Sequence, residues 1–483
     1  MPIDIEFTPL LHRRTKIVAT LGPVSSSAKT IGELIDAGVN VFRLNMSHGD
    51  HASHTEVFNT IRQVSNQKKA HIAILADLCG PKIRCGLFEN GSINLLPGEQ
   101  VIVTTREVTG KQGLIPSAYH QLNQDAQVGT QLLFDDGKLE LLVEKIDQTE
   151  LHCKVIQGGE LKDRKGINIP NCEISAPALT EKDYADARLM LGLQVDFLGL
   201  SFTRKAADIE LLRDLMDEFD RPAAIIAKME NHEALINADE IILASDGIMV
   251  ARGDMGVELN PEEVPIAQSQ LVLAARKLHK PVIVATQMLE SMLTQTQPTR
   301  AEVSDISHAV QSGADAIMLS GETAAGQYPV EAVAMMDRIA RLNESYQWQT
   351  DHFRSLQSHS ATPPIALHHA VANAIASLSL DLQVYCVIVM SQGGTSAAVV
   401  SSTRPSAPIV AASPKAATCR KMNLYWGTVA VETDTDAIEA HHKLASNLAN
   451  EVFGANPGDR ILLLEGFNIN PNQHSPAITV LTV

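Results

Sequence analysis

The sequence predicts an α/β protein: a (β/α)8 TIM barrel with a small β-barrel lid domain inserted at its mouth and an α/β domain after it. Three observations indicate this arrangement. Eight short apolar runs alternate with helical patterns, turn-rich short strands interrupt this alternation once, and a polar stretch separates the last part of the chain. At 483 residues the chain is long enough for two to four domains.

The eight apolar runs read as the buried parallel strands of the barrel, whose first part we assign to residues 1–78 and whose second part to 178–348. Helical patterns such as Lys29–Asp36 and Pro329–Leu342 lie between the runs, and Thr299 opens a capping-box spacing. In a TIM barrel the active site lies at the C-terminal strand ends, where most of these runs carry polar residues. The runs are Lys16–Gly22, Val39–Ser47, His71–Asp77, Asp196–Phe202, Ala223–Glu230, Gly247–Asp254, Pro281–Gln287 and Ala316–Glu322.

The interruption, residues 79–177, reads as an inserted β domain. Turn signals separate its short strands at Leu96–Gly98, Asp135–Gly137 and Gly158–Gly159. Because the insert follows a barrel strand, it is expected at the mouth of the barrel, where it can act as a lid.

The last part, residues 349–483, begins with a polar stretch and continues as a separate α/β domain. A helix is predicted at Ile365–Leu380, and the next strand, Val384–Met390, leads into a Gly-rich loop before a further helix. Such a loop can cradle a phosphate, although a plain strand-to-helix turn fits the sequence equally well. Its residues are Ser391, Gln392, Gly393, Gly394, Thr395 and Ser396.

Composition excludes several classes of partner. A formal net charge of −17 argues against nucleic acid or an anionic membrane, since both demand a basic surface. No apolar run is long enough to span a bilayer. The six scattered cysteines favour reduced thiols and a cytoplasmic location.

The end of one strand carries an ammonium and a carboxylate on the same face, because Lys228 and Glu230 are two residues apart. Glu230 and Asp254, at neighbouring strand ends, suit Mg2+ or Mn2+. A structural ion pair of these carboxylates with Lys228 or Arg252 is the alternative.

Arg43, Lys82, Arg84 and Lys228 add positive charge near the same mouth, which favours a phosphorylated substrate and phosphoryl transfer. The hydroxyls of Thr286 and Ser320 could relay a proton or could simply be satisfied at a strand end. Two other groups weigh less: the evenly spaced His48, His51 and His54 lack a zinc partner, and Cys79 and Cys85 read as packing residues.

With these residues established, the chain resembles the pyruvate kinase family along essentially its whole length. The resemblance implies transfer of phosphate from phosphoenolpyruvate to ADP, which gives pyruvate and ATP. Several long motifs in the right order carry it: Thr15–Pro23, Arg43–Gly49, Ile226–Asn231, Asp246–Asp254, Ala285–Met292 and Leu319–Thr323.

The resemblance also implies roles for individual residues. Lys228 would stabilise the transferring phosphoryl group, with Glu230 and Asp254 as Mg2+ ligands and Arg43 on the phosphate. Gly253, Asp254 and Thr286 would contact the substrate carboxylate, and Thr286 and Ser320, through water, would deliver the proton to the enolate. The positions matching nucleotide contacts are Asn45, His48, Arg84 and Lys165; those matching the monovalent-cation site are Asn45, Ser47 and Asp77.

One departure concerns potassium. Many members of the family carry Glu where this chain has Lys82, as in the branch that works without K+. A fixed ammonium can supply the positive charge of a bound K+, so we expect K+ independence.

The C-terminal domain resembles the allosteric domain of the family, with 391–396 as its phosphate loop. Residues 465–473 depart from the loop expected of members regulated by fructose 1,6-bisphosphate, so activation by a sugar monophosphate or AMP is expected, in a homotetramer. Two rival functions remain: a Mg2+-dependent aldolase or lyase acting on pyruvate or phosphoenolpyruvate, and a non-catalytic effector-binding protein.

Overall fold

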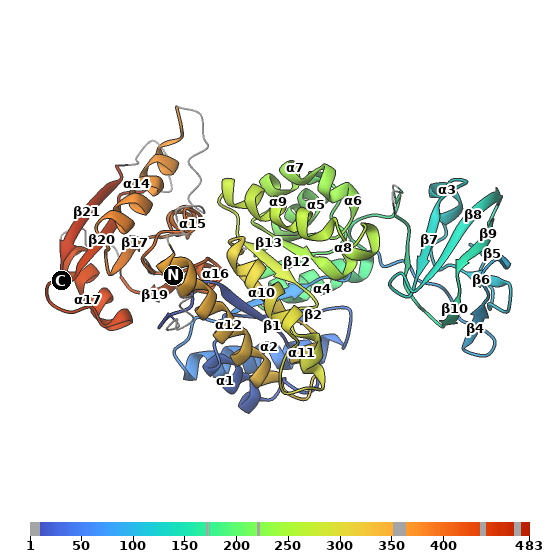
Figure 1. Ribbon diagram of the computed structural model, residues 1–483, viewed down its shortest axis with the longest axis horizontal. Helices are drawn as coiled ribbons and strands as arrows, with labels where there is room; N and C mark the ends of the chain where they lie inside the picture. Colours follow the sequence, from blue (N-terminus) through green and yellow to red (C-terminus); the bar gives the residue numbers. More distant parts are fainter. Residues whose placement is uncertain are drawn as a thin grey trace, which may run out of the picture.

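The computed structural model describes residues 10–170, 172, 174–219, 223–350, 364–434, 441–467 and 475–483. Three bodies lie in a row, with the barrel between the C-terminal domain on one side and the inserted domain on the other (Figure 1). The predicted departure at residues 465–473 falls mostly outside the described residues, which resume at Ser475.

The central body is a closed barrel of eight parallel strands, and β3 pairs directly with β12 across the insertion. The strands are β1 (Lys16–Thr20), β2 (Val41–Asn45), β3 (Ala73–Asp77), β12 (Phe197–Leu200), β13 (Ala224–Met229), β14 (Gly247–Ala251), β15 (Val282–Ala285) and β16 (Ala316–Leu319). All eight predicted strands are confirmed, and most stop before the polar residues that end the predicted runs.

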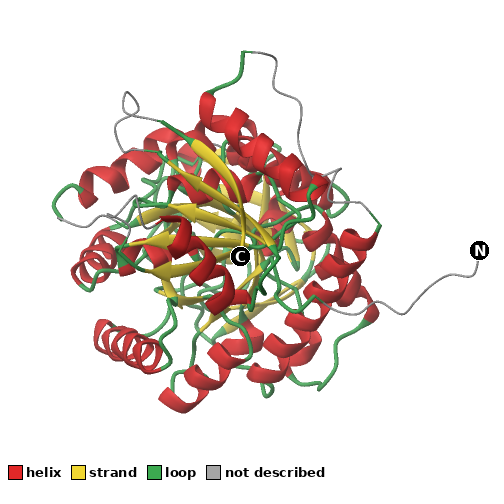
Figure 2. Cartoon of the chain, turned by 90° about the vertical axis from the view of Figure 1, so that its left-hand side faces the viewer, coloured by secondary structure: helices red, strands yellow, loops and turns green. Residues whose placement is uncertain are grey.

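Helices surround the barrel and form a ring when the molecule is viewed along its long axis (Figure 2). Thr299 caps α10 through the predicted capping box with Glu302. The helical segments are α1 (Ala28–Asp36), α2 (His51–Gln67), α4 (Glu181–Gly192), α5 (Ala206–Met216), α6 (His232–Ile236), α7 (Ala238–Ala244), α8 (Arg252–Glu258), α9 (Val264–Lys277), the 3-10 helix η1 (Glu290–Leu293), α10 (Arg300–Gln311), α11 (Gly321–Ala324) and α12 (Pro329–Gln349).

The inserted domain is a mainly β unit with its own core, as predicted, and it joins β3 to α4. Its strands pair into a six-stranded and a two-stranded sheet. The predicted Asp135–Gly137 turn connects the β7–β8 hairpin. The elements are β4 (Ser92–Leu95), β5 (Gln100–Thr104), β6 (Leu114–Pro116), α3 (Leu122–Asp125), β7 (Gln131–Phe134), β8 (Leu139–Asp147), β9 (Glu150–Gln157), β10 (Gly159–Lys162) and β11 (Ile167–Asn168).

The C-terminal domain is a five-stranded sheet in the order β19-β18-β17-β20-β21, parallel except for β21, with a hydrophobic cluster on each face. Its elements match the predicted alternation: α14 (Leu367–Asp381), β17 (Cys386–Met390), α15 (Thr395–Ser402), β18 (Ile409–Ser413), α16 (Ala416–Met422), β19 (Thr428–Glu432), α17 (His441–Phe453), β20 (Arg460–Glu465) and β21 (Ala477–Thr482).

This domain closes the N-terminal end of the barrel. Leu424, from the α16–β19 connection, is fully buried and belongs to the same cluster as the residues that fill the barrel interior. Arg420 pairs with Asp196, and the wholly buried Arg404 pairs with Asp315 at 3.0 Å. The barrel and the C-terminal domain are therefore joined by buried ion pairs and by a common hydrophobic cluster. They pack as one unit at the N-terminal end of the barrel.

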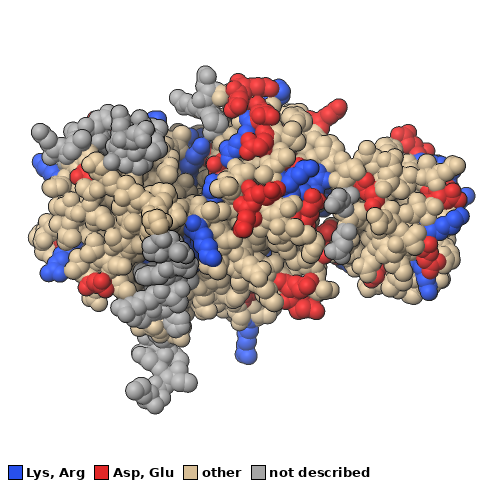
Figure 3. All heavy atoms as spheres, turned by 90° about the horizontal axis from the view of Figure 1, so that it is seen from above, with Lys and Arg blue, Asp and Glu red and all other residues tan. Residues whose placement is uncertain are grey.

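Surface and thiols agree with the composition. On the face shown in Figure 3, acidic and basic side chains are interspersed. The six cysteines are all free thiols. Among the described residues, no helix combines the length and the apolar character needed to cross a bilayer.

Candidate active site

The predicted charges meet at the C-terminal end of the barrel, where β13 places Lys228 among acceptors. The Lys228 Nζ lies 2.7 Å from Glu230 Oε1 and 3.4 Å from Asp77 Oδ1, and it donates to Ser201 Oγ at 2.7 Å. Burial alone would lower the pKa of Lys228, but the Asp77 and Glu230 carboxylates raise it above its ordinary value. The ammonium is therefore held charged in a site almost closed to solvent.

Asp77 links this ammonium to the predicted phosphate-binding arginine. Arg43 Nε donates to Asp77 Oδ2 at 2.7 Å, and Arg43 also donates to Thr20 Oγ1 at 3.1 Å. Burial opposes ionisation of Asp77, yet Lys228 and Arg43 together lower its pKa. One buried carboxylate thus fixes two cations side by side, and this spacing suits an anion with several oxygens.

Glu230 and Asp254 follow the ends of adjacent strands, since β13 pairs with β14. Asp254 lies in the first turn of the short helix α8 rather than in the strand itself. The backbone N–H of Phe202 donates to Glu230 Oε2 at 2.8 Å. Burial raises the pKa of Glu230, and the nearby Asp254 carboxylate raises it further against the opposing effect of Lys228. A buried and a half-buried carboxylate that repel each other fit the donor set of a divalent cation.

The alternative reading of these carboxylates as ion-pair partners is correct in part. Glu230 does pair with Lys228, whereas Arg252 pairs with Asp305 at 2.6 Å and donates to the Thr286 carbonyl at 2.6 Å. Arg252 is thus a support for the β14 and β15 ends and is not aimed at the carboxylate pair.

Gly253 and Thr286 also come together. The Gly253 N–H donates to Thr286 Oγ1 at 2.7 Å, and this hydroxyl donates to the Ala285 carbonyl at 2.6 Å. Thr286 has a φ of +71°, a conformation that is costly for a β-branched residue. Strain of this kind is found at ligand sites, where surrounding contacts such as those of Arg252 hold the backbone in place.

Ser320 is the N-cap residue of α11, and its backbone N–H donates to Glu322 Oε2 at 2.8 Å. Its Oγ is buried, and no described residue forms a hydrogen bond with it. An orphaned buried hydroxyl calls for an explanation, and a bound water or ligand is one. No described residue satisfies the Ser320 hydroxyl, whereas the Thr286 hydroxyl does have protein partners.

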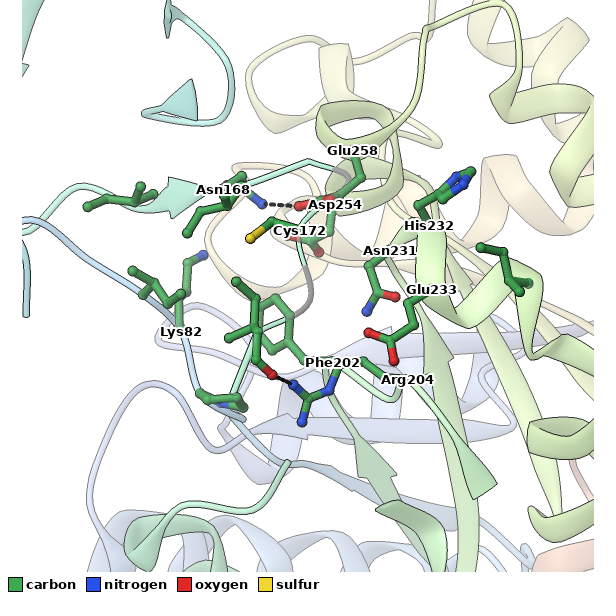
Figure 4. A pocket seen from close by; sticks show the side chains of 16 residues that line it. Lys82, Asn168, Cys172, Phe202, Arg204, Asn231, His232, Glu233, Asp254 and Glu258 are labelled. Carbon is green, nitrogen blue, oxygen red and sulfur yellow. Dashed lines mark hydrogen bonds between the residues drawn. The ribbon is translucent and has the colours of Figure 1, made fainter. Parts of the chain in front are cut away.

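A cavity of about 370 Å³ opens beside the charged cluster, between the barrel mouth and the inserted domain. Asp254 and Phe202 line the cavity and also belong to the charged cluster, since the Phe202 N–H donates to Glu230. Lys82 lines the cavity from the segment that connects β3 to the insert (Figure 4). Asn168 of the insert donates to Glu258 of α8 at 3.3 Å across the cavity. The two domains thus line one site.

The predicted nucleotide and monovalent-cation positions occupy two loops. After β2, the backbone N–H of Ser47 donates to Asn45 Oδ1 at 3.1 Å, and the His48 N–H donates to the Asn45 carbonyl at 3.3 Å. In the insert, Arg84 donates to the Arg164 carbonyl and Lys165 pairs with Asp135 at 2.8 Å. In the described part of the chain, Arg84 and Lys165 thus pair within the insert and not with Lys228 or Glu230.

The three evenly spaced histidines do not form a metal cluster among the described residues, because His51 contacts Asp186 and His54 contacts the His48 carbonyl. Sequence reasoning missed Ser201, the hydrogen-bond partner of Lys228. It ends a predicted barrel strand, so the strand-end rule could have found it.

The predicted phosphate loop lies between β17 and α15. Gly394 has a φ of +91° at the start of α15, and the buried Ser391 accepts from the Ala397 N–H at 3.4 Å. The loop has the strand–turn–helix context that a phosphate cradle requires.

Comparisons with known proteins cover nearly the whole chain. Residues 12–333 match the family model "Pyruvate kinase, barrel domain", and residues 369–481 match "Pyruvate kinase, alpha/beta domain". Curated pyruvate kinases of Staphylococcus aureus strains MRSA252 and USA300 are each 41% identical over 460 residues, 94% of this chain and 78% of theirs. A crystal structure of a pyruvate kinase from Cryptosporidium parvum superimposes with a TM-score of 0.90 at 33% identity, covering 97% of this chain and 96% of that one.

Proposed function

The chain belongs to the pyruvate kinase family of phosphotransferases. We therefore propose that it transfers the phosphoryl group of phosphoenolpyruvate to ADP. The observation that supports the proposal best is the buried Lys228 ammonium, held between Asp77 and Glu230 beside a cavity shared with the inserted domain. A fixed positive charge of this kind would stabilise a phosphoryl group during its transfer.

Mg2+, or Mn2+, would be held by Glu230 and Asp254. The fit rests on the raised pKa of Glu230, whose burial and proximity to Asp254 leave negative charge poorly compensated. When bound, the ion would neutralise phosphate and substrate oxygens.

The protein's own cations would do the rest of the charge stabilisation. Arg43 keeps its orientation through Asp77 and Thr20, so its guanidinium would bind the phosphate with little reorganisation. Lys228 would meet the transferring group, and Lys82 would add a second ammonium from the cavity side. Phosphoryl transfer needs positioning and charge, which this set supplies.

The substrate carboxylate would be bound by the Gly253–Asp254 turn and Thr286. The Gly253 N–H donates to the Thr286 hydroxyl at 2.7 Å, so these groups are close enough to contact one carboxylate. Proton delivery to the enolate would run through Thr286 or through Ser320 with a water, because the Ser320 hydroxyl has no described protein partner.

The nucleotide would bind between the barrel and the lid, at Asn45, His48, Arg84 and Lys165. Closure of the insert would bring Arg84 and Lys165 toward the cavity and exclude water. ATP formation from phosphoenolpyruvate and ADP tests the activity directly. Pyruvate or phosphoenolpyruvate turnover without nucleotide would instead favour the lyase reading.

K+ independence follows from Lys82, which would supply the charge of a monovalent ion near Asn45, Ser47 and Asp77. Rates at saturating substrate in tetramethylammonium buffer, with and without added K+, test it. A many-fold rise on adding K+ would show that Lys82 does not replace the ion, whereas equal rates support it.

Regulation would act through the loop 391–396, with a sugar monophosphate or AMP as the activator of a cytoplasmic homotetramer. Titration of these effectors at low phosphoenolpyruvate tests the first part, and sedimentation of the purified protein tests the second. Strong activation by fructose 1,6-bisphosphate with no response to monophosphates would contradict it.

A further inference from the structure

Three histidines meet at the seam between the barrel and the C-terminal domain, far from the barrel mouth. His279 lies in the α9–β15 connection of the barrel, whereas His368 and His369 lie in the first turn of α14. Their ring centroids are 4.2 Å (279–369), 4.4 Å (368–369) and 5.7 Å (279–368) apart. One ligand atom from each lies within 4.8 Å of the others.

One arrangement of the hydrogen bonds around His279 leaves its Nε2 able to bind a metal. Ser402 Oγ lies 2.7 Å from the Val399 carbonyl and 2.5 Å from His279 Nδ1. With its proton donated to the carbonyl, the hydroxyl accepts from Nδ1–H, and Nε2 presents a lone pair. Nε2 is buried and has no hydrogen-bond partner among the described residues.

This arrangement is the usual one for a metal-binding histidine, whose second ring nitrogen donates to an oxygen that fixes the ring. Burial, together with the nearby His369, His368 and Lys280, lowers the pKa of His279 to about 3. Lys280 itself is held by the Ser245 carbonyl at 2.5 Å.

The histidine backbone is also held in place. His279 has a φ of +57°, which is uncommon for a residue other than glycine, and such strain is maintained only by surrounding structure. Tetrahedral zinc with nitrogen ligands needs donors about 3.4 Å apart. The three imidazoles can close to that distance by side-chain rotation, because His368 is exposed and His369 only partly buried.

We propose that His279, His368 and His369 form a binding site for a transition-metal ion of the zinc class, with a fourth position open to water. Three imidazoles select Zn2+, Co2+, Ni2+ or Cu2+ over Mg2+, which prefers oxygen ligands. Because the ligands come from two domains, the bound ion fastens α14 to the barrel. It therefore provides a second link between these domains, separate from the buried pairs at the barrel end.

Co2+ titration of the full chain tests the proposal, since tetrahedral Co2+ absorbs strongly in the visible range. Saturating Mg2+ is kept present so that Co2+ does not bind to the carboxylates at the barrel mouth and contribute to the spectrum. The expected result is one tetrahedral Co2+ per chain, displaced by Zn2+ and accompanied by a higher unfolding temperature. Absence of this spectrum in the unaltered protein at millimolar Co2+ would overturn the proposal.

Variants assign the ligands. His368→Gln removes an exposed side chain, so the fold is retained, and Co2+ affinity should fall at least about 100-fold. Ser402→Ala keeps all three imidazoles but loses the acceptor that orients His279, and affinity should fall about 10- to 100-fold. His442→Gln, an exposed histidine of α17, is the matched control and should bind normally. Unchanged Co2+ affinity in both His368→Gln and Ser402→Ala would refute the assignment.

Discussion

Replacement of Lys228 by Met tests the centre of the proposed mechanism. The ammonium attracts Glu230 at 2.7 Å and Asp77 at 3.4 Å by about 6 and 5 kcal/mol at an effective dielectric constant of about 20. Desolvation offsets most of this attraction, but removing one partner of a buried pair still costs about 3–5 kcal/mol. Met fills a similar volume, so the loss is mainly that of charge.

Turnover should fall about 1000-fold or more, since a preorganised charge at the transferring group is lost. Destabilisation should be large without metal and smaller with Mg2+, because a bound cation compensates Glu230 in place of the ammonium. Thermal unfolding with and without Mg2+, together with ATP formation, measures both effects.

Lys182→Met is the matched control. Lys182 pairs with the buried Asp186 at 2.5 Å near the same barrel mouth, but its own side chain is 53% exposed and His51 also lies 2.7 Å from Asp186, so the change should destabilise the protein clearly less than Lys228→Met does. The reasoning is refuted if Lys228→Met keeps turnover within tenfold of the original, or if Mg2+ leaves its destabilisation unchanged.

Three further predictions concern other buried groups. Ser320→Ala should lower turnover about 100-fold if the Ser320 hydroxyl relays the proton, and unchanged turnover would exclude the relay. The free energy of unfolding should change by less than about 1 kcal/mol, because that hydroxyl has no described partner. Burial lowers the pKa of Lys16 to about 7, so between pH 7 and its unfolded pKa near 10.5 the unfolded chain binds the extra proton and stability rises with pH. Lys16→Met should remove that part of the rise in unfolding temperature, and an unchanged pH profile would contradict it. Arg404→Met leaves Asp315 buried without its partner and should cost about 3–5 kcal/mol, which thermal unfolding measures; Asp315→Asn in the same chain should recover part of the loss, and no recovery would mean that the pair is not the cause.

The barrel could be predicted from sequence because its signal is local and repeated. A run such as Ala223–Glu230 is apolar, short and ends in charge, and eight such runs leave few alternatives to a closed parallel sheet. The strand-end rule also predicts that Lys228, Glu230 and Asp254 lie at the same end of the barrel.

The partners within the site could not be predicted in the same way. That Asp77 lies between Arg43 and Lys228 depends on strand register and side-chain rotamers across three strands, which no local pattern records. The role of Arg252 was likewise hidden, because its acceptors lie on the next strand and on α10. The histidine cluster joins residues about ninety positions apart and has no sequence signature.

The position of Leu424 bears on how the chain folds as it is synthesised. The last barrel strand, β16, ends at Leu319, so the residue that fills the open end of the barrel is made roughly a hundred residues later. At typical ribosomal rates of about 5–20 residues per second, this delay is on the order of 5–20 s. During that interval the barrel has all eight strands but an uncovered apolar opening, so the nascent chain is most exposed to aggregation and chaperone binding just before its final domain emerges.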